Sequence, residues 1–442
     1  MPSRLSFATA FIVAAVFLAA PHVSRAQPAA PSDTTTLRLE ALLRGVAQAN
    51  PRLRAARLRA EALSYEPEQA GALPDPTAGL TYQPRPILTA RGYQRSQFQV
   101  GQQIPFPGKR RLRSEVAKLD AEVASAEAGV LGQDLVFDVS RSYYKLYRAQ
   151  EQTRLVQAFQ RQLDGFEEAA TTRYEVGEGA QQAILKAQIE RERLTLRLQR
   201  LAAERRSALE ALARLTGRPR LDAPAAQVEV APPAAPAAEE AGLAAALSAR
   251  PEAEALRRSI ARASREEALA RKAFYPDFTV SARYFDLGAS DLGPAMTGRD
   301  ALALSVGVTV PLWLGKQRAR LRGAQVRQQQ ANTRLDALQL EIETELADLR
   351  NRLRRQERQL ELLEEALIPQ AETALEATLS AYSAGRTDFL DLLDAERTLF
   401  QLQMEREAVY ARFLTTSARI QRTLGRAALP DQQQRQQAPE GD

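Results

Sequence analysis

The chain contains no cysteine and only one histidine, His22. The absence of cysteine excludes disulfides, thiolate metal sites and cysteine nucleophiles. His22 lies in a segment that we expect to be removed on export, which leaves no histidine to bind a metal ion or to act as an acid or base. We also find no G-x-S-x-G sequence, no phosphate-binding loop and no metal-binding motif. We therefore expect no enzyme, no cofactor and no protein-bound metal ion.

Aromatic residues are scarce, at 6% of the 442 residues, whereas Ala, Leu, Arg, Gln and Glu dominate. This composition favours long helices over compact mixed domains. The formal net charge is +6 and the pI about 9.6. However, the 60 Lys and Arg residues are interspersed with 54 Asp and Glu residues, which is typical of solvated helix surfaces with i,i+4 ion pairs. The most basic run, 350–358, has no aromatic residue to stack on a base, so we expect no nucleic-acid partner.

Long apolar segments are also missing after the N-terminus, so we expect no transmembrane helix. Residues 7–20 are apolar but too few to cross a bilayer comfortably as a helix. Arg4 precedes this run, and Ser24-Arg25-Ala26 follows it as a small-x-small cleavage site. We interpret residues 1–26 as a signal peptide, the alternative being an uncleaved anchor. The mature chain is therefore expected to be exported.

The sequence contains an internal duplication with an offset of about two hundred residues. The repeated motifs keep their order: Leu73-Pro74-Asp75 and Tyr275-Pro276-Asp277, Ile104-Pro105 and Val310-Pro311, Gly108-Lys109 and Gly315-Lys316, Tyr174 to Gly177 and Tyr382 to Gly385, and Thr216-Gly217 and Leu424-Gly425. Each unit is much longer than a solenoid repeat of about 50 residues. We expect a first repeat over 27–220, a Pro/Ala linker over 221–238 without folded structure, a second repeat over 239–426 and a disordered tail over 427–442.

Two stretches in each repeat alternate large apolar residues with small or polar ones, as strands do. We expect these strands at about 77–84, 95–105, 278–286 and 301–311. Each has about 10 residues, the length that a tilted strand needs to cross a bilayer. A half-buried strand of a soluble sheet has the same period. Two such hairpins between long helices, in an exported chain, favour the membrane.

Long helices follow the hairpins. We expect long helices over 109–174 and 316–382, with return helices over 181–215 and 387–424. The first would be roughly 100 Å long at 1.5 Å per residue. Heptad seams run along both long helices, at Leu112, Val116, Leu119, Val123, Ala126 and Val130 and at Leu335, Leu338, Ile342, Leu346, Leu349 and Leu353. Pro369 interrupts the second helix, and shorter helices are expected over 37–48 and 51–72.

Four strands are too few for a closed membrane barrel, which needs about eight or more, and an open strand edge cannot face lipid. Three copies would supply twelve strands and twelve helical positions. We therefore expect a mainly α-helical chain with a membrane β-barrel part. If the strands lie in a membrane, the chain must form an oligomer, in which a closed β-barrel continues into an α-helical barrel.

From about residue 37 to 425, the sequence resembles the TolC-like outer membrane factors, the exit ducts of Gram-negative efflux pumps and type I secretion systems. The most specific parts are the strand-to-helix junctions, the two Tyr-x-x-Gly turns and the segment from Gly385 to Asp394. The resemblance implies a homotrimer in the outer membrane, with a 12-stranded β-barrel that is continued by a large periplasmic α-helical barrel. It also implies docking to a periplasmic adaptor that connects to an inner-membrane pump.

The resemblance assigns roles to residues of the two turns. Asp391 and Asp394 would line the periplasmic mouth as acidic rings, and Tyr382 stands where the family has a gate tyrosine. The alternative is that both aspartates are ordinary solvated helix residues. Asp388, an early acidic residue of the return helix, is a further candidate for the pore or gate. The tips with Tyr174, Gly177 and Gly385 would dock the adaptor.

Two positions depart from the family pattern. Ala183 and Thr387 stand where well-known members carry a gate aspartate and its arginine partner. Arg386 is the neighbouring candidate to substitute for that arginine. Many relatives are also lipidated on an N-terminal cysteine, which this chain lacks.

The cargo is the least constrained property. The junctions Ile104-Pro105-Phe106-Pro107-Gly108-Lys109 and Pro311-Leu312-Trp313 look most like the cation-efflux branch that serves resistance-nodulation-division (RND) pumps. Only Met296 and Met404 remain as soft ligands after processing, so selectivity would reside in the pump. The alternatives are a duct for multidrug or organic-solute efflux or for type I secretion, and a periplasmic coiled-coil scaffold or adaptor.

Overall fold

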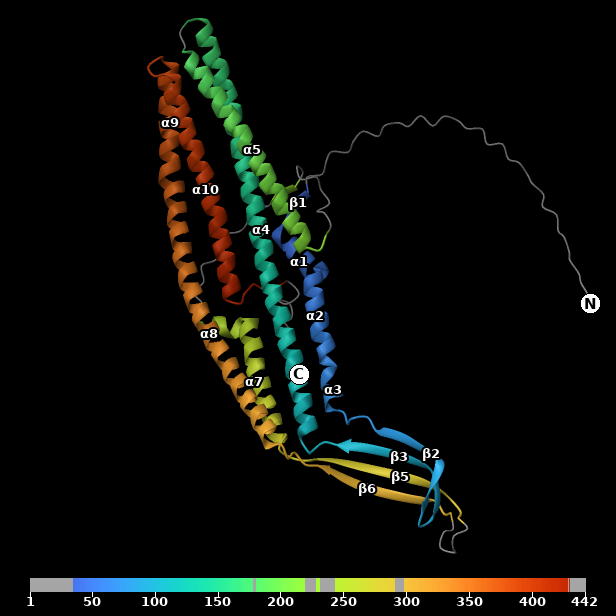
Figure 1. Cartoon of the computed structure of the whole chain (residues 1–442). Helices are drawn as coiled ribbons and strands as arrows, with labels where there is room; N and C mark the ends of the chain where they lie inside the picture. Colours follow the sequence, from blue (N-terminus) through green and yellow to red (C-terminus); the bar gives the residue numbers. More distant parts are fainter. Residues whose placement is uncertain are drawn as a thin grey trace, which may run out of the picture.

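The computed structural model describes residues 35–177, 180–218, 228–230, 243–290, 298–427 and 429. The expected signal peptide, most of the linker and nearly all of the tail lie outside these residues. The molecule is elongated, with a body of long helices lying side by side and one sheet that projects from one end of the body (Figure 1). Each described helix is either too short or too polar to cross a membrane.

Two helical hairpins form most of the body. The first consists of α4 (Lys109–Glu175) and α5 (Gln181–Leu215). The second consists of α8 (Leu314–Leu362), the π-helical turn η2 (Leu363–Leu367), α9 (Ile368–Ser383) and α10 (Phe389–Thr423). The single helix expected over 316–382 is therefore wrong in detail. Pro369 has no N–H to donate to the carbonyl four residues earlier, and the wider π turn absorbs this gap in the hydrogen-bond ladder.

Shorter elements lie along the body between its middle and the sheet: β1 (Thr35–Leu37), α1 (Leu39–Ala49), α2 (Pro51–Ser64), α3 (Glu66–Gly71), α6 (Leu243–Ala249) and α7 (Pro251–Lys272). Asn50 caps α2, because its side-chain oxygen accepts hydrogen bonds from the N–H groups of Arg52 and Leu53 at 2.9 and 3.0 Å. The helix expected over 51–72 is divided at Tyr65, since Pro67 cannot donate the next backbone hydrogen bond.

Two expectations about unstructured segments are wrong. The segment 221–238 contains β4 (Val228–Val230), which pairs in parallel with β1. The tail expected over 427–442 begins with two buried residues, Ala427 and Leu429, which belong to the main core with Val136 and Leu414. Both segments are short and rich in polar residues or proline, so their few apolar residues give no periodic signal before the surrounding helices are in place.

The heptad expected along the second long helix is confirmed in its middle. Leu338, Ile342 and Leu346 are buried and cluster with Ile420 and Leu424 at the end of α10 and beyond. The seam expected along the first long helix is too narrow. Besides Leu112 and Val123, the helix buries Ala117, Ala124 and Ala128, because α4 packs against α2 on one side and α7 on the other.

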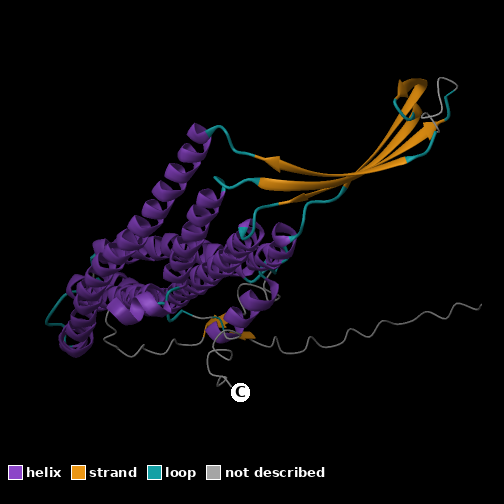
Figure 2. Cartoon of the chain, turned by 90° about the horizontal axis from the view of Figure 1, so that it is seen from below, coloured by secondary structure: helices purple, strands orange, loops and turns teal. Residues whose placement is uncertain are grey.

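The sheet contains β2 (Thr77–Thr89), β3 (Gly92–Ile104), β5 (Asp277–Gly288) and β6 (Ala301–Thr309), in the order β2-β3-β5-β6 with antiparallel neighbours. Figure 2 shows it as one twisted layer extending away from the helices. The first hairpin is longer than expected. Pro84 and Pro86 do not end β2, because its register against β3 shifts between Tyr82 and Ile87 and leaves the prolines outside the ladder.

The junction between sheet and helices joins the two halves. Lys109, in the first turn of α4, places its Nζ 2.9 Å from the Asp277 carboxylate and 2.9 Å from the carbonyl oxygen of Tyr275. The N–H of Phe106 donates to the same carboxylate at 2.7 Å, and the Phe106 ring stacks on Tyr275 with centroids 4.6 Å apart. The Lys109 side chain is 8% exposed, so removing either partner would leave a buried charge unpaired.

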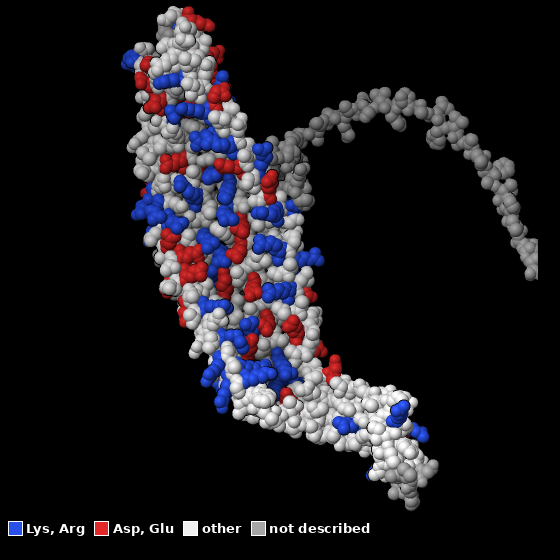
Figure 3. All heavy atoms as spheres, viewed as in Figure 1, with Lys and Arg blue, Asp and Glu red and all other residues white. Residues whose placement is uncertain are grey.

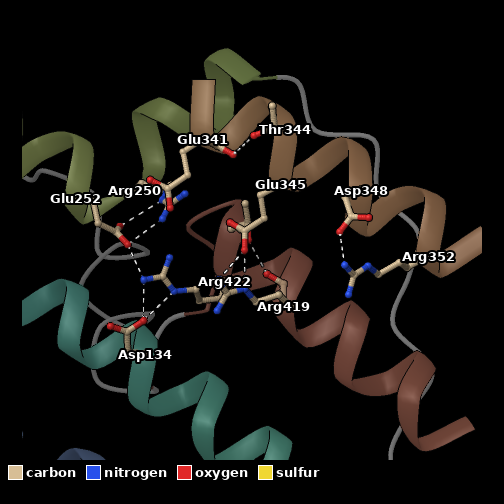
Figure 4. A network of polar contacts seen from close by, with 11 residues as sticks. Asp134, Arg250, Glu252, Glu341, Thr344, Glu345, Asp348, Arg352, Arg419 and Arg422 are labelled. Atoms are coloured by element: carbon tan, nitrogen blue, oxygen red, sulfur yellow. Dashed lines mark hydrogen bonds and ion pairs between the residues drawn. The ribbon is translucent and has the colours of Figure 1, made fainter. Parts of the chain in front are cut away.

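A second ionic network joins helices of both halves in the middle of the body (Figure 4). Arg422 of α10 contacts Asp134 of α4 at 2.6 Å and Glu252 of α7 at 2.7 Å. Arg250 binds the same Glu252 at 2.9 Å. Burial would lower the pKa of Arg422, but the two carboxylates outweigh it and the pKa is raised. Burial likewise opposes ionisation of Glu252, yet the two arginines hold its pKa below the ordinary value.

Candidate functional site

The two long hairpins turn at the end of the body opposite the sheet (Figure 1). Each turn contains a glycine in the left-handed region, Gly177 with φ of 81° and Gly385 with φ of 68°. This confirms the conformation expected from the Tyr-x-x-Gly motifs. The N–H of each glycine donates to the carbonyl of its tyrosine, Tyr174 or Tyr382, at 3.0 Å. No atom lies within 4 Å of where a side chain would begin at either glycine, so both tips are open on this side.

The two tyrosines of these motifs have different surroundings. Tyr174 is 47% exposed, whereas Tyr382 is 9% exposed. The guanidinium of Arg173, from α4, lies over the Tyr382 ring at 4.2 Å from its centroid. An N–H of the same guanidinium also donates to the Tyr382 carbonyl at 3.3 Å. One arginine of the first half therefore fixes both the ring and the backbone at the end of α9.

Aromatic rings continue this contact between the hairpins. The Phe389 ring, in the first turn of α10, lies edge-on to Tyr382 with centroids 6.3 Å apart. Phe166 of α4 lies edge-on to Phe389, also at 6.3 Å. Edge-to-face pairs at this separation are favourable. The tips of the two halves are thus joined by aromatic and cation–π contacts.

A cavity of about 380 Å³ lies between the tips. It is lined by Ala170, Arg173, Ala180, Gln182, Ala183, Tyr382, Gly385, Thr387, Asp388, Phe389 and Leu390. Ala183 and Thr387, the two positions that depart from the family pattern, therefore face the same space. Neither carries a charge, so no ion pair can form between them. Arg386 is exposed, and none of the described residues forms a hydrogen bond or ion pair with its side chain.

Three aspartates follow one exposed face of α10. Asp388 is its N-cap, and its carboxylate accepts a hydrogen bond from the N–H of Leu390. Asp391 accepts a hydrogen bond from the Thr387 hydroxyl, and the Asp394 side chain is exposed. Leu392 and Leu393 on the same helix are buried. The structure therefore presents all three carboxylates away from the core, with one turn between neighbours.

Sequence reasoning missed Arg173 and Glu396. Arg173 corresponds to Ala381 in the second half, so comparing the residue before each tyrosine would have shown this difference between the tips. Glu396 of α10 is 6% exposed, and burial raises the pKa of its carboxyl. A single glutamate in a polar helix is typical of a surface residue, so nothing in its sequence context predicts this burial.

The sheet at the other end of the body has an exposed apolar face. Leu302, Leu304 and Val306 of β6 are 70%, 77% and 71% exposed. Lys, Arg, Asp and Glu are spread over the helical body, whereas the sheet shows very few of them (Figure 3). Exposed apolar surface of this extent marks a surface that contacts lipid or another protein.

Comparison with known proteins identifies the family. The model of the outer membrane efflux protein family matches residues 42–218 and 242–426, one segment in each half. The chain belongs to this family. It is therefore an outer-membrane protein of a Gram-negative bacterium and a channel rather than an enzyme, and the expected family resemblance is confirmed.

Individual relatives agree with this result. The chain is 28% identical over 405 residues to the cobalt-zinc-cadmium resistance protein CzcC of Cupriavidus metallidurans, covering 88% of this chain and 90% of CzcC. The structure is similar to the outer membrane protein VceC of Vibrio cholerae, with a TM-score of 0.72, 22% identity, and coverage of 88% and 96%. It is also similar to the CmeC outer membrane channel of Campylobacter jejuni, with a TM-score of 0.74, 13% identity, and coverage of 91% and 90%. The structural similarities establish the fold of outer-membrane channels.

The contacts of Arg173 predict that Arg173→Ala loosens the junction between the tips. The lost cation–π contact and hydrogen bond contribute about 1–2 kcal/mol, which corresponds to an about 5–30-fold larger open population. Amide hydrogen exchange over 381–393 in outer-membrane vesicles measures this change. Arg386→Ala is the matched control and should leave exchange unchanged. Faster exchange in Arg386→Ala, together with unchanged exchange in Arg173→Ala, would contradict the role assigned to Arg173.

Proposed function

We propose that this chain is the exit duct of a tripartite efflux system. It passively conducts substrates from an inner-membrane pump and a periplasmic adaptor to the cell exterior. The observation that carries this proposal is the combination, in a member of the efflux family, of an apolar four-stranded sheet and long helical hairpins that end in open tips. A periplasmic scaffold would have no use for the exposed apolar strands.

The duct is a homotrimer. In the sheet order β2-β3-β5-β6, the outer edges of β2 and β6 have no partner among the described strands. Backbone groups at such edges cannot remain unpaired in lipid. Pairing β6 of each copy with β2 of the next closes three copies into a 12-stranded barrel with the apolar face outward. The helices below it continue as an α-helical barrel in the periplasm.

The periplasmic mouth lies at the tips. In the trimer, Asp391 and Asp394 of three copies form acidic rings around the axis, which concentrate negative potential and favour cations. Tyr382, held by Arg173, links the two hairpins in this conformation. Opening would separate the two hairpins at this contact. The turns at Gly177 and Gly385, with the exposed Tyr174, are the surface that meets the adaptor.

The cargo is a heavy-metal cation exported by an RND pump. The support is the similarity to a cobalt-zinc-cadmium resistance protein over 88% of the chain, together with the acidic face of α10. The duct itself performs no chemistry on the cargo, so specificity for one cation over another resides in the pump.

The apolar face of β6 predicts that Val306→Arg prevents assembly in the outer membrane. An arginine facing the middle of a bilayer costs about 2–4 kcal/mol in each copy. The yield of heat-modifiable trimer in the outer-membrane fraction measures this effect. Ser305→Arg places the same side chain on the opposite face of the same strand and should assemble. A normal trimer yield for Val306→Arg would show that this face does not contact lipid.

The acidic rings predict that Asp391→Asn combined with Asp394→Asn weakens block by divalent cations and reduces cation selectivity. Six carboxylates would be removed from the mouth of each trimer. Single-channel currents in planar bilayers measure both properties. Asp336→Asn, an exposed carboxylate on α8, serves as the control. Unchanged selectivity and block in the double variant would place both aspartates outside the conducting path.

The proposed cargo predicts that deleting the gene lowers, by several-fold, the cobalt, zinc and cadmium concentrations that the host tolerates. Re-expressing the chain should restore tolerance, whereas the Val306→Arg variant should not. Growth in graded metal concentrations measures this effect, with organic dyes and detergents as the comparison. Sensitisation to the organic compounds alone would indicate organic-solute efflux instead.

A further inference from the structure

Asp75 and Lys316 are exposed on opposite edges of the molecule. Asp75 lies between α3 and β2, and Lys316 lies in the first turn of α8. Within the part of the chain that the structure describes, no hydrogen bond or ion pair involves either side chain. Each has a counterpart in the other repeat, and these two counterparts bind one another.

The counterparts are Asp277 and Lys109. Pro74-Asp75 corresponds to Pro276-Asp277, and Gly315-Lys316 corresponds to Gly108-Lys109. In the chain, Lys109 of the first repeat contacts Asp277 of the second at 2.9 Å, and both side chains are largely buried. The contact joins α4, the helix that follows the first strand hairpin, to β5, the strand that begins the second hairpin. Repeating it around a ring requires Lys316 to meet the Asp75 of another copy.

The order of the elements leads to the same pairing. In the lower body, α2 packs on α4, α4 on α7, and α7 on α8, and the sheet follows the same order with β2-β3-β5-β6. The contacts α4 with α7 and β3 with β5 join the first repeat to the second. Among the described elements, the outer edges of this row are α2 and β2 on one side and α8 and β6 on the other. A ring of copies brings α8 of one copy against α2 and α3 of the next.

Both of these outer helix faces carry a second heptad stripe, made mostly of small or apolar residues with one glutamine in each. On α8 the stripe steps by four and three residues through Ala319, Gly323, Val326, Gln330, Thr333, Ala337 and Leu340. On α2 and α3 it steps by three and four through Ala55, Leu58, Ala62, Tyr65, Gln69 and Ala72. Val326 is 61% exposed and Tyr65 is 60% exposed. The two stripes run in opposite directions relative to the sheet, as an antiparallel coiled-coil pair requires.

The charges of the two helix segments nearest the sheet are complementary. The first part of α8 carries Lys316, Arg318, Arg320 and Arg322, and no acidic residue occurs before Asp336. The end of α2 and the whole of α3 carry Glu61, Glu66 and Glu68, followed by Asp75. A basic helix segment beside an acidic one favours this pairing and disfavours pairing of either segment with its own kind.

We propose that Lys316 of each copy binds the Asp75 carboxylate of the next copy, with the outer stripe of α8 packed on the outer stripe of α2 and α3. This intersubunit contact rests on the trimer of the proposed function and specifies how its copies meet. The occupant of both faces is a second copy of this chain. The in-chain register, in which Val100 pairs with Ala282, places Val306 of β6 opposite Leu80 of β2 in the neighbouring copy.

Cross-linking tests this contact, because the natural chain has no cysteine. In the full chain we would introduce Asp75→Cys and Lys316→Cys together and treat outer-membrane vesicles with a short bismaleimide. We expect covalent dimers and trimers in denaturing gels. Either single variant should remain monomeric in the gel. Lys109→Cys with Asp277→Cys should cross-link within one chain and give no covalent oligomer.

Charge reversal gives an independent measurement. Asp75→Lys alone, or Lys316→Asp alone, should lower the amount of heat-resistant trimer by about tenfold or more, since a like-charge pair replaces an ion pair. Combining both reversals should restore most of it. Lys118→Asp makes the same charge change at an exposed position of α4, whose sides pack on α2 and α7 of the same chain, and should leave the trimer yield close to that of the natural chain.

The outcomes separate this contact from the duct itself. A normal trimer without the intersubunit cross-link, and without rescue by the double reversal, would overturn the contact while leaving the duct in place. Protection of Lys316→Cys from maleimide by phosphatidylglycerol vesicles, again without a cross-link, would overturn it in favour of a lipid headgroup on this face. A chain that stays monomeric in the outer membrane would overturn both proposals.

Discussion

Hydrocarbon offers no hydrogen-bond partner, so every backbone N–H and C=O of a strand in a bilayer has to be paired within the protein. With the sheet in the proposed barrel, this requirement is the main constraint on the arrangement of both repeats. Each repeat supplies one hairpin, and the chain pairs the two hairpins through β3 and β5. This pairing satisfies the backbone groups at the inner edges of the two hairpins. The backbone groups at the outer edges of β2 and β6 have no partner among the described strands. The helices below repeat the arrangement, with α4 and α7 in contact at the centre and α2 and α8 at the outside.

The junction at Lys109 shows how the halves are coupled. One lysine binds the carboxylate and a carbonyl that precede the next hairpin, so the direction of β5 is fixed relative to α4. Further along the body, Arg422 joins Asp134 to Glu252. Both networks connect residues far apart in the sequence and are largely buried. They resist sliding of one helix past another, because a shift would leave charges unpaired in a low-dielectric interior.

At the tips the two repeats have diverged while the backbone has not. Both turns use a left-handed glycine after a tyrosine, yet only Tyr382 is covered, because Arg173 has alanine as its counterpart. Where the family pattern has an ion pair, this chain has Ala183 and Thr387 around a cavity. The tips are held together by a cation–π contact and aromatic pairs, which contribute about 0.5–2 kcal/mol each. A contact of that size can be broken by a partner without unfolding the hairpins.

The duplication is visible in the sequence, and so are the two long hairpins, the four strands and the left-handed glycines, because period, proline and glycine act over a few residues. Other features arise from contacts that form only in the folded chain. The π turn before Pro369, the pairing of β4 with β1, and the burial of Leu429 depend on neighbours distant in the chain. The sequence did not indicate the role of Arg173, because it contacts the ring and the carbonyl of Tyr382, which lies 209 residues away. Local pattern specifies each element, whereas contacts between elements depend on how helices of both halves meet in space.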